Sequence, residues 1–204
     1  MNIYEYGILL IVAYLFGSFP SAFILLKITQ KKDIRSEGSG NVGAMNALRA
    51  SKKKWIALVV LILDLFKGAF PAYYFTRVVV TDKIFLLILV SGVLFGHVFP
   101  VWLKFKGGRG LAVVAGALLV IKPILVLIWL VIWAIFFAII RRHIIASMIA
   151  TALIPLIVYF TLDIYFSKDI LLMVLPVCLI IFQRHLERIP DIIKETKISI
   201  ENGA

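Results

Sequence analysis

The run GLAVVAGALLVIKPILVLIWLVIWAIFFAII, residues 110–140, decides how many times the chain can cross a membrane. It holds 31 consecutive residues, of which only Lys122 is charged. A spanning helix needs about 20 mostly apolar residues, so the run is too long for one span and short for two. Pro123 follows the charge and can occupy the first position of a helix, where its missing N–H costs nothing. We therefore predict a short helix over 110–121 and a second helix over 123–140.

Five further apolar runs lie on either side of this one. Four of them are long enough to span a membrane, and they cover residues 7–26, 55–76, 84–103 and 144–162. The fifth, 170–182, has 13 residues and contains Pro176, which predicts a short or partial span. The chain of 204 residues is 62% hydrophobic with a mean hydropathy of +1.04, whereas a soluble domain is about 45–50% apolar. We therefore predict an all-α, polytopic integral membrane helical bundle of about seven transmembrane helices, with residues 1–204 as a single domain.

The basic residues are distributed unevenly between the segments that join these spans, and the formal net charge is +11. The face that is expected to be cytoplasmic carries 17 of them: Lys27, Lys31, Lys32, Arg35, Arg49, Lys52, Lys53, Lys54, Lys104, Lys106, Arg109, Arg141, Arg142, Arg184, Arg188, Lys194 and Lys197. The opposite face carries Arg77, Lys83, Lys122 and Lys168. Because Lys and Arg flank the cytoplasmic side, we expect the N-terminus outside and the C-terminus in the cytoplasm. A membrane setting argues against nucleic acid as the partner and leaves an anionic ligand open.

The first cytoplasmic segment, DIRSEGSGNVGAMNALR (residues 33–49), is rich in glycine and small polar residues. Gly38, Gly40 and Gly43 allow close backbone approach, and successive N–H groups in such a turn can form a nest for an anion. Helical periodicity resumes after Gly43, and a helix N-terminus also favours phosphate, which Arg49 could bind bidentately. The alternative interpretation is a flexible glycine loop between two helices.

The second cytoplasmic segment, GHVFPVWLKFKGGRG (residues 96–110), follows the same pattern. Three cations alternate with three glycines directly before a helix, an arrangement typical of a phosphate cradle. These residues are Lys104, Lys106, Gly107, Gly108, Arg109 and Gly110. The spacing does not match the Walker pattern. Ordinary topology-setting charge would explain the cations but not the glycines. Segments 35–49, 97–110, 141–147 and 184–191 fall on one face, so they can converge into one site.

Two histidines and one intramembrane ion pair are further candidates. His97 and His185 lie at the ends of spans, where each could act as a general base, a phosphate donor or a structural group. Asp64 and Lys67 lie three residues apart within a span, and we interpret them as a self-neutralising structural pair, with a functional role as the alternative. Small residues at Gly92/Gly96 and Ala112/Gly116 predict close helix packing. No cluster of His, Cys and carboxylate residues has metal-ligand spacing, so we expect neither a metal site nor a cofactor.

Four of these stretches together resemble a known family, the bacterial membrane acyl-phosphate:glycerol-3-phosphate acyltransferases. They are GSFPSA (17–22), GSGNVGAMNALR (38–49), DLFKG (64–68) and GHVFPVWLKFKGGRGLA (96–112), with later matches around Ser147 and from His185 to Glu187. The resemblance implies a multi-pass enzyme of the bacterial inner membrane with its active site facing the cytoplasm. The expected reaction transfers a fatty acyl group from acyl phosphate to the 1-hydroxyl of glycerol 3-phosphate, giving lysophosphatidic acid and inorganic phosphate. The resemblance also implies that the protein is surrounded by membrane lipid and has no obligate protein partner.

The resemblance also assigns site residues. Substrate binding is expected from Ser36, Ser39, Gly40, Asn41, Gly43, Asn46, Arg49, Lys104, Gly107, Gly108, Arg109, Gly110, Ser147 and His185. Catalysis is expected from His185, His97 and Lys104, with the base left open between a histidine and a substrate phosphate oxygen. The sequence departs from the family pattern at five positions: Met45, Arg109, Val113, Leu186 and Arg188.

Two other classes of protein remain alternatives from the residues alone. A transporter or channel for an organic phosphate would also explain several spans and anion-binding loops, but it predicts anion sites near the membrane midplane and repeated halves. A non-catalytic membrane scaffold leaves the two glycine-rich cationic loops without a purpose. Because the anion signals lie on one face and no internal repeat is visible, the enzyme is favoured.

Overall fold

The computed structural model describes residues 2–78, 83–187 and 189, and these residues form a helical protein without a named strand. Its helices are α1 (Ile3–Gly17), α2 (Ser21–Gln30), α3 (Ala44–Ser51), α4 (Lys54–Val78), α5 (Lys83–Val98), α6 (Leu111–Ile121), α7 (Pro123–Ile140), α8 (His143–Phe160) and α9 (Lys168–Leu186). Two 3-10 helices, η1 (Ile34–Ser36) and η2 (Val101–Leu103), lie in the glycine-rich segments. The predicted cytoplasmic cations Arg188, Lys194 and Lys197 lie outside the described residues.

Six segments of the described chain are long and apolar enough to cross a membrane. They are Ile3–Gln30, Lys54–Arg77, Ile84–Leu103, Pro123–Ile140, His143–Phe160 and Lys168–Leu186, and α6 is a shorter apolar helix. The prediction of an all-helical membrane bundle is confirmed, and so is the split of the 110–140 run, because α6 ends at Ile121 and α7 begins at Pro123.

Two predicted boundaries are wrong. The final span is a full helix of 19 residues, since α9 continues through Pro176 to Leu186. The first run is interrupted, because α1 ends at Gly17 and α2 begins at Ser21. The sequence between them contains Pro20, whose ring disfavours a helical conformation of the preceding residue.

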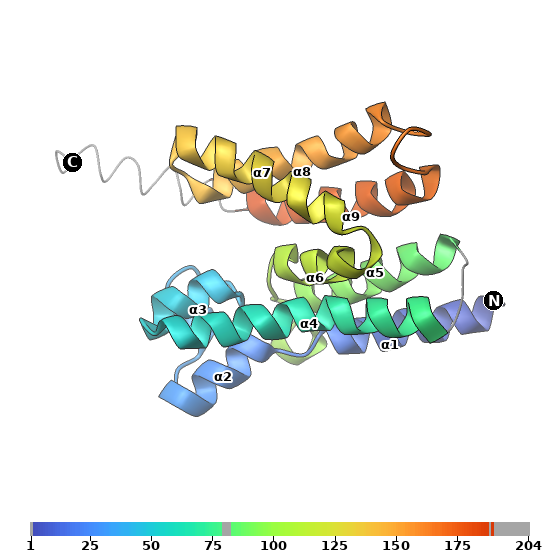
Figure 1. The fold of residues 1–204 in the computed structure, drawn as a ribbon. Coiled ribbons are helices and arrows are strands. Elements are labelled where there is room, and N and C mark those ends of the chain that lie inside the picture. Colours follow the sequence, from blue (N-terminus) through green and yellow to red (C-terminus); the bar gives the residue numbers. More distant parts are fainter. Residues whose placement is uncertain (1, 79–82, 188, 190–204) are drawn as a thin grey trace.

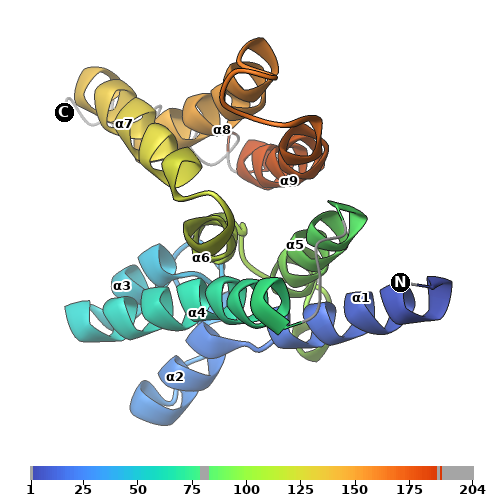
Figure 2. The same ribbon diagram turned by 45° about the vertical axis from the view of Figure 1, so that its right-hand side comes forward.

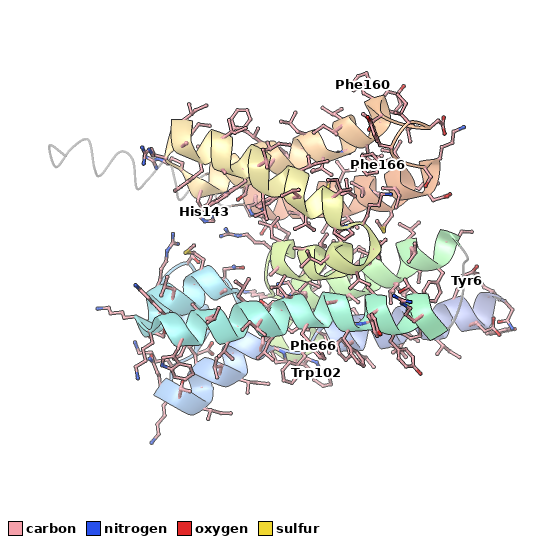
Figure 3. The ribbon with its side chains drawn as sticks, viewed as in Figure 1. Tyr6, Phe66, Trp102, His143, Phe160 and Phe166 are labelled. Atoms are coloured by element: carbon pink, nitrogen blue, oxygen red, sulfur yellow. The ribbon has the colours of Figure 1, made fainter. Side chains whose placement is uncertain are left out.

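The helices form two groups (Figure 1). One contains α7, α8 and α9, and the other contains α1, α2, α3 and α4, with α5 and α6 between them. In the view of Figure 2, α6 lies against α4 and leads into α7, and α5 lies between α1 and α9. One end of the molecule carries α2 and α3 together with His143, whereas Tyr6, Phe160 and Phe166 lie toward the opposite end (Figure 3).

The two tightest helix contacts depend on glycine. A Cβ at Gly116 would collide with the backbone carbonyl of Leu65 on α4, and one at Gly96 would collide with the carbonyl of Tyr14 on α1. The backbones of α6 and α4, and of α5 and α1, therefore approach more closely than any larger residue permits. This confirms the predicted packing role of the small residues, which fixes where α5 and α6 present the loop between them.

The intramembrane charges form the predicted pair. Lys67 Nζ lies 2.7 Å from Asp64 Oδ1, and both side chains are buried. The Ser21 hydroxyl donates to the same carboxylate oxygen at 2.7 Å, and Lys67 Nζ donates to the Ser21 oxygen at 3.0 Å. Because Ser21 is the first residue of α2, the network ties α4 to the interruption between α1 and α2.

Candidate active site

The first glycine-rich loop is held in shape by its own hydrogen bonds. Asn46 is 1% exposed; its amide oxygen accepts from the Ser39 N–H at 2.8 Å, and its Nδ2 donates to the carbonyls of Ile34 and Glu37 at 3.2 and 3.0 Å. The Gly40 N–H donates to the carbonyl of Glu37 at 2.9 Å. The N–H groups of Ser39 and Gly40 are therefore used within the loop, and the predicted nest does not form at these two positions. Asn46 acts here as the residue that holds the loop.

Asp33 fixes the entrance of this loop. Its carboxylate caps η1 by accepting from the Arg35 N–H at 2.9 Å and also binds the Arg35 guanidinium, with Nη2–Oδ2 at 2.6 Å. These hydrogen bonds hold the pKa of the Asp33 carboxyl at about 2, below its ordinary value of 3.8. The Arg35 guanidinium also lies over the ring of Phe23 on α2, 5.2 Å from its centroid. The loop is thus attached to α2 at its start and to α3 at its end.

The second glycine-rich loop folds back on the end of α5. The N–H groups of Gly107 and Gly108 donate to the carbonyls of Val98 and His97, both at 3.0 Å. A Cβ at Gly108 would collide with the imidazole of His97. The two glycines therefore serve close packing, and their N–H groups are occupied, contrary to the predicted cradle. Gly110, with φ +89°, then turns the chain into α6.

The two loops meet in an open hollow of about 810 Å³ at the end of the bundle that carries α3. Its lining residues come from both loops and from the end of α9: Ser39, Gly40, Asn41, Lys106, Gly107, Arg109, Arg184 and Glu187. The predicted convergence is confirmed for segments 35–49 and 97–110 and for residues 184–187 of the last segment, whereas segment 141–147 does not line the hollow. Three cations against one carboxylate make the hollow a site for anions.

The other predicted site residues lie outside the lining of this hollow. Ser36, Arg49 and Lys104 are exposed, Gly43 is half-buried, and Asn46, Gly108 and Gly110 are buried in or beside the loops. Ser147 is 1% exposed, and its hydroxyl donates to the carbonyl of His143 at 2.8 Å. Sequence reasoning did not assign Arg184 or Glu187 to the site, and it named Lys106 only as a cation of the expected phosphate cradle. The signals for these two were their place beside His185 on the expected cytoplasmic face and, for Glu187, the family-like stretch from His185 to Glu187.

Both candidate histidines are enclosed. His185 is 1% exposed, and its Nδ1 lies 2.7 Å from the carbonyl oxygen of Ile181. A carbonyl only accepts, so Nδ1 carries a proton and the neutral ring has its free lone pair on Nε2. His97 lines a separate, very small cavity with Ser21, Lys67, Gly107 and Gly108. Among the described residues, no group of His, Cys and carboxylate side chains could hold a metal ion.

The described residues also form an apolar groove of about 550 Å³. It is lined by α6, α7, α8 and α9, with Leu111, Val114, Leu118, Trp129, Thr151 and Ile181 among its walls. Leu111 is two residues from Arg109, so the charged hollow and the apolar groove are adjacent along the chain. The indole N–H of Trp129 donates to the Thr151 hydroxyl at 3.0 Å, which satisfies both polar groups inside the groove. The arrangement fits a ligand with an anionic head and an apolar tail.

Comparison with known proteins agrees with this geometry. The model of the glycerol-3-phosphate acyltransferase family matches residues 7–195. A glycerol-3-phosphate acyltransferase of Ehrlichia canis (strain Jake) is 39% identical over 200 residues, covering 97% of this chain and 100% of that protein. The corresponding protein of Pelagibacter ubique (strain HTCC1062) is 40% identical over 152 residues, covering 74% of this chain and 78% of its own.

Solved structures give the same result. The crystal structure of PlsY (YgiH), an integral membrane glycerol 3-phosphate acyltransferase, superimposes in its glycerol 3-phosphate form with a TM-score of 0.81 and 29% identity. Its lysophosphatidic acid form superimposes with a TM-score of 0.79, and each comparison covers 94% of this chain and 93% of the other. The chain therefore belongs to the glycerol-3-phosphate acyltransferase family.

Proposed function

We propose that this chain transfers a fatty acyl group from acyl phosphate to the 1-hydroxyl of glycerol 3-phosphate, forming lysophosphatidic acid and inorganic phosphate. The observation that carries the proposal is the junction of the two spaces: Arg109 lines the cationic hollow and Leu111 lines the apolar groove. An acyl phosphate has a phosphate at one end and a long apolar chain at the other. Its phosphate fits the hollow and its chain fits the groove.

The hollow is built for phosphate recognition. Lys106, Arg109 and Arg184 supply positive charge, and Ser39 and Asn41 supply neutral hydrogen-bonding groups. Lys104 lies exposed on the second loop and Arg49 lies exposed on α3, where they can approach a phosphate that extends beyond the lining. Both substrates carry a phosphate, and two phosphates near each other need several cations to offset their repulsion. Ser147 and His185 are assigned to the wall behind the site.

The chemical step is an acyl transfer. The 1-hydroxyl oxygen of glycerol 3-phosphate attacks the carbonyl carbon of the acyl phosphate, and an ester C–O bond forms. The C–O bond to the phosphate breaks, and phosphate leaves with the electron pair. The hydroxyl proton passes to a base. Because phosphate is a good leaving group, the protein mainly has to hold the two substrates in contact and stabilise the negative charge on the carbonyl oxygen.

A substrate phosphate oxygen is the proton acceptor that this geometry favours. His97 lies beneath Gly108, and His185 uses Nδ1 for the carbonyl of Ile181. Neither ring lines the hollow. We assign both histidines positioning roles, and Lys104 the role of an electrostatic group near the reacting phosphate.

We place the enzyme in the bacterial inner membrane, with the hollow facing the cytoplasm and residues 1–204 acting as one domain. The support is the charge distribution, since the two cationic loops lie at the end of the bundle that carries α2 and α3 (Figure 1). Cytoplasmic segments are the ones enriched in Lys and Arg. The N-terminus at the opposite end would then be outside.

Phosphate release by the purified protein tests the function. Glycerol 3-phosphate is supplied with palmitoyl phosphate and, separately, with palmitoyl-CoA. We expect equal amounts of phosphate and lysophosphatidic acid with the first donor and no product with the second. Product from the thioester alone would contradict the proposed donor. No product from either would contradict the enzyme and favour transport of glycerol 3-phosphate, which uptake into vesicles would measure.

Lys104→Ala gives a residue-level test with a close control. Loss of one electrostatic donor at an acyl-transfer site typically lowers the rate about a hundredfold, and we expect a loss of that order. Lys52→Ala is the control, because both lysines are exposed and have nearly the same left-handed backbone, with φ of +54° and +55°. Both changes therefore keep a Cβ on the same left-handed backbone and lower the net charge equally. Equal activity of the two variants would show that Lys104 has no specific role in the active site.

A further inference from the structure

Arg184 and Glu187 form an ion pair in the wall of the hollow, at the end of α9. Arg184 Nη1 donates to Glu187 Oε2 at 2.6 Å across one helical turn. Among the described residues that line the hollow, Glu187 is the one acidic side chain, and the remaining charged ones are the cations Lys106 and Arg109. A carboxylate in an anion site opposes binding unless it can move away.

The two partners of this pair are held very differently. The Arg184 side chain is 19% exposed, and its guanidinium lies over the ring of Phe99, 5.6 Å from the centroid. Its Nε is buried and has no acceptor among the described residues. The Glu187 side chain is 49% exposed and can turn into solvent at little cost. The cation is therefore fixed in place, and the carboxylate is the mobile partner.

A phosphate satisfies Arg184 better than Glu187 does. A phosphate monoester carries a charge of about −1.5 to −2 at neutral pH and offers three acceptor oxygens. A guanidinium binds such a group with two parallel hydrogen bonds. Glu187 accepts one hydrogen bond, from Nη1, whereas a phosphate can accept from both terminal nitrogens of the guanidinium.

We propose that Glu187 is an internal counter-ion of Arg184, which the phosphate of a substrate displaces so that Arg184 becomes a phosphate ligand. This inference rests on the proposed acyl transfer for the identity of the substrates. Glu187 competes with phosphate for one cation, so it weakens phosphate binding and returns to Arg184 when inorganic phosphate leaves. The pair thereby limits inhibition by the product.

Binding of radiolabelled inorganic phosphate to the purified full-length protein, measured by equilibrium dialysis, tests the competition without needing turnover. An ion pair of this exposure contributes up to about 1 kcal/mol, so Glu187→Gln is expected to bind phosphate about two- to fivefold more tightly. Glu37→Gln is the control: it removes a negative charge from the same face, but Glu37 pairs with Lys32 at 3.7 Å outside the hollow. Unchanged or weaker binding in Glu187→Gln, or an equal gain in Glu37→Gln, would overturn the proposal.

A double-mutant cycle shows whether the effect passes through Arg184. Arg184→Gln is expected to weaken phosphate binding, and adding Glu187→Gln to it should restore nothing. A gain from Glu187→Gln that persists without Arg184 would also overturn the proposal. Arg184→Lys keeps the charge and loses the planar fork, so it provides a second variant should the glutamine variant fold poorly.

Kinetics distinguish which phosphate displaces Glu187. The KM of Arg184→Lys rises for glycerol 3-phosphate if Arg184 binds that substrate, and for acyl phosphate if it binds the donor. If Glu187→Gln binds inorganic phosphate more tightly but the protein forms no product, the proposed acyl transfer is overturned. The role of Glu187 as counter-ion of Arg184 would still stand. An active protein in which Glu187→Gln changes neither phosphate binding nor product inhibition would support the acyl transfer and overturn the counter-ion proposal.

Discussion

Gly108 lies directly against the imidazole ring of His97, and its N–H donates to the His97 carbonyl oxygen at 3.0 Å. Side chain and backbone of the same histidine thus fix one glycine of the second loop. Gly107 is fixed in the same way by the carbonyl of Val98. The shape of the cationic loop is therefore determined by the last turn of α5, which explains why a glycine pair is needed there.

Gly108→Ala should consequently disturb the active site without unfolding the bundle. The added Cβ collides with His97, and overpacking of this kind costs about 1–3 kcal/mol. We expect a rise in the KM for the phosphate substrates and a lower kcat, measured by phosphate release. Adding His97→Ala should recover part of the activity, because it removes the colliding ring. Gly7→Ala on α1, where a new Cβ meets nothing within 4 Å, is the control and should leave kinetics unchanged.

The buried charges at the break between α1 and α2 give a prediction about stability. Lys67→Met leaves the Asp64 carboxylate buried without its cation, and loss of one partner of a buried pair costs about 3–5 kcal/mol. We expect a large drop in the thermal unfolding midpoint in detergent. Asp64→Asn combined with Lys67→Met should be more stable than Lys67→Met alone. Equal stability of the single and double variants would show that the pair is not electrostatically coupled.

A matched control for this pair lies on the cytoplasmic surface. Lys32 and Glu37 are 3.7 Å apart, and 43% and 35% of their side-chain surfaces are exposed, so water screens their attraction. Lys32→Met is therefore expected to change the free energy of unfolding by less than about 1 kcal/mol. A loss as large as that of Lys67→Met would mean that the detergent environment, not burial, controls the measurement.

Much of this fold was predictable because the deciding signals are local. Lys122 and Pro123 mark the boundary between two helices whatever lies around them, and the spacing of Asp64 and Lys67 makes them neighbours on one helix. The wrong boundaries follow from reading composition alone. Pro20 interrupts the first run through its backbone geometry, whereas Pro176 is accommodated inside α9.

The site was less predictable because its details depend on contacts between distant segments. The glycines suggested free N–H groups for phosphate, but the N–H of Ser39 is bonded to Asn46 and that of Gly108 to His97. No local pattern reveals such a partner. From the sequence alone, Arg184 is indistinguishable from an ordinary cation that flanks a membrane span. Its place in the hollow follows from the position of α9 beside the two loops. The sequence therefore indicated segments that line the hollow, but it did not indicate which of their N–H groups are bonded within the fold.

The loop entrance predicts a dependence of stability on acid. The pKa of Asp33 is held at about 2, below the ordinary 3.8, by hydrogen bonds from Arg35. Its ionised form therefore favours the folded state, and this stabilisation is complete above pH 3.8 and is lost as the pH falls toward 2. We expect Asp33→Asn to be less stable than the natural chain at pH 6, with the difference in unfolding midpoint shrinking below pH 3.8. A difference that does not change with pH would contradict the ionic contribution.

Trp129 gives a prediction about acyl-chain selectivity. Its ring lines the groove and is held by the hydrogen bond to Thr151, and Leu111, two residues from Arg109 of the hollow, lines the same groove. If the acyl chain enters the groove from the hollow, a chain that reaches the indole gains about 0.8 kcal/mol for each methylene that it buries there, and a chain too short to reach it lacks this gain. Trp129→Ala should therefore lower kcat/KM for hexadecanoyl phosphate by about tenfold or more, and that for octanoyl phosphate much less. Trp133→Ala is the matched control, because Trp133 stacks on Trp129 at 6.4 Å but lies outside the groove lining. A uniform loss across chain lengths, or an equal shift in Trp133→Ala, would show that the acyl chain does not occupy this groove.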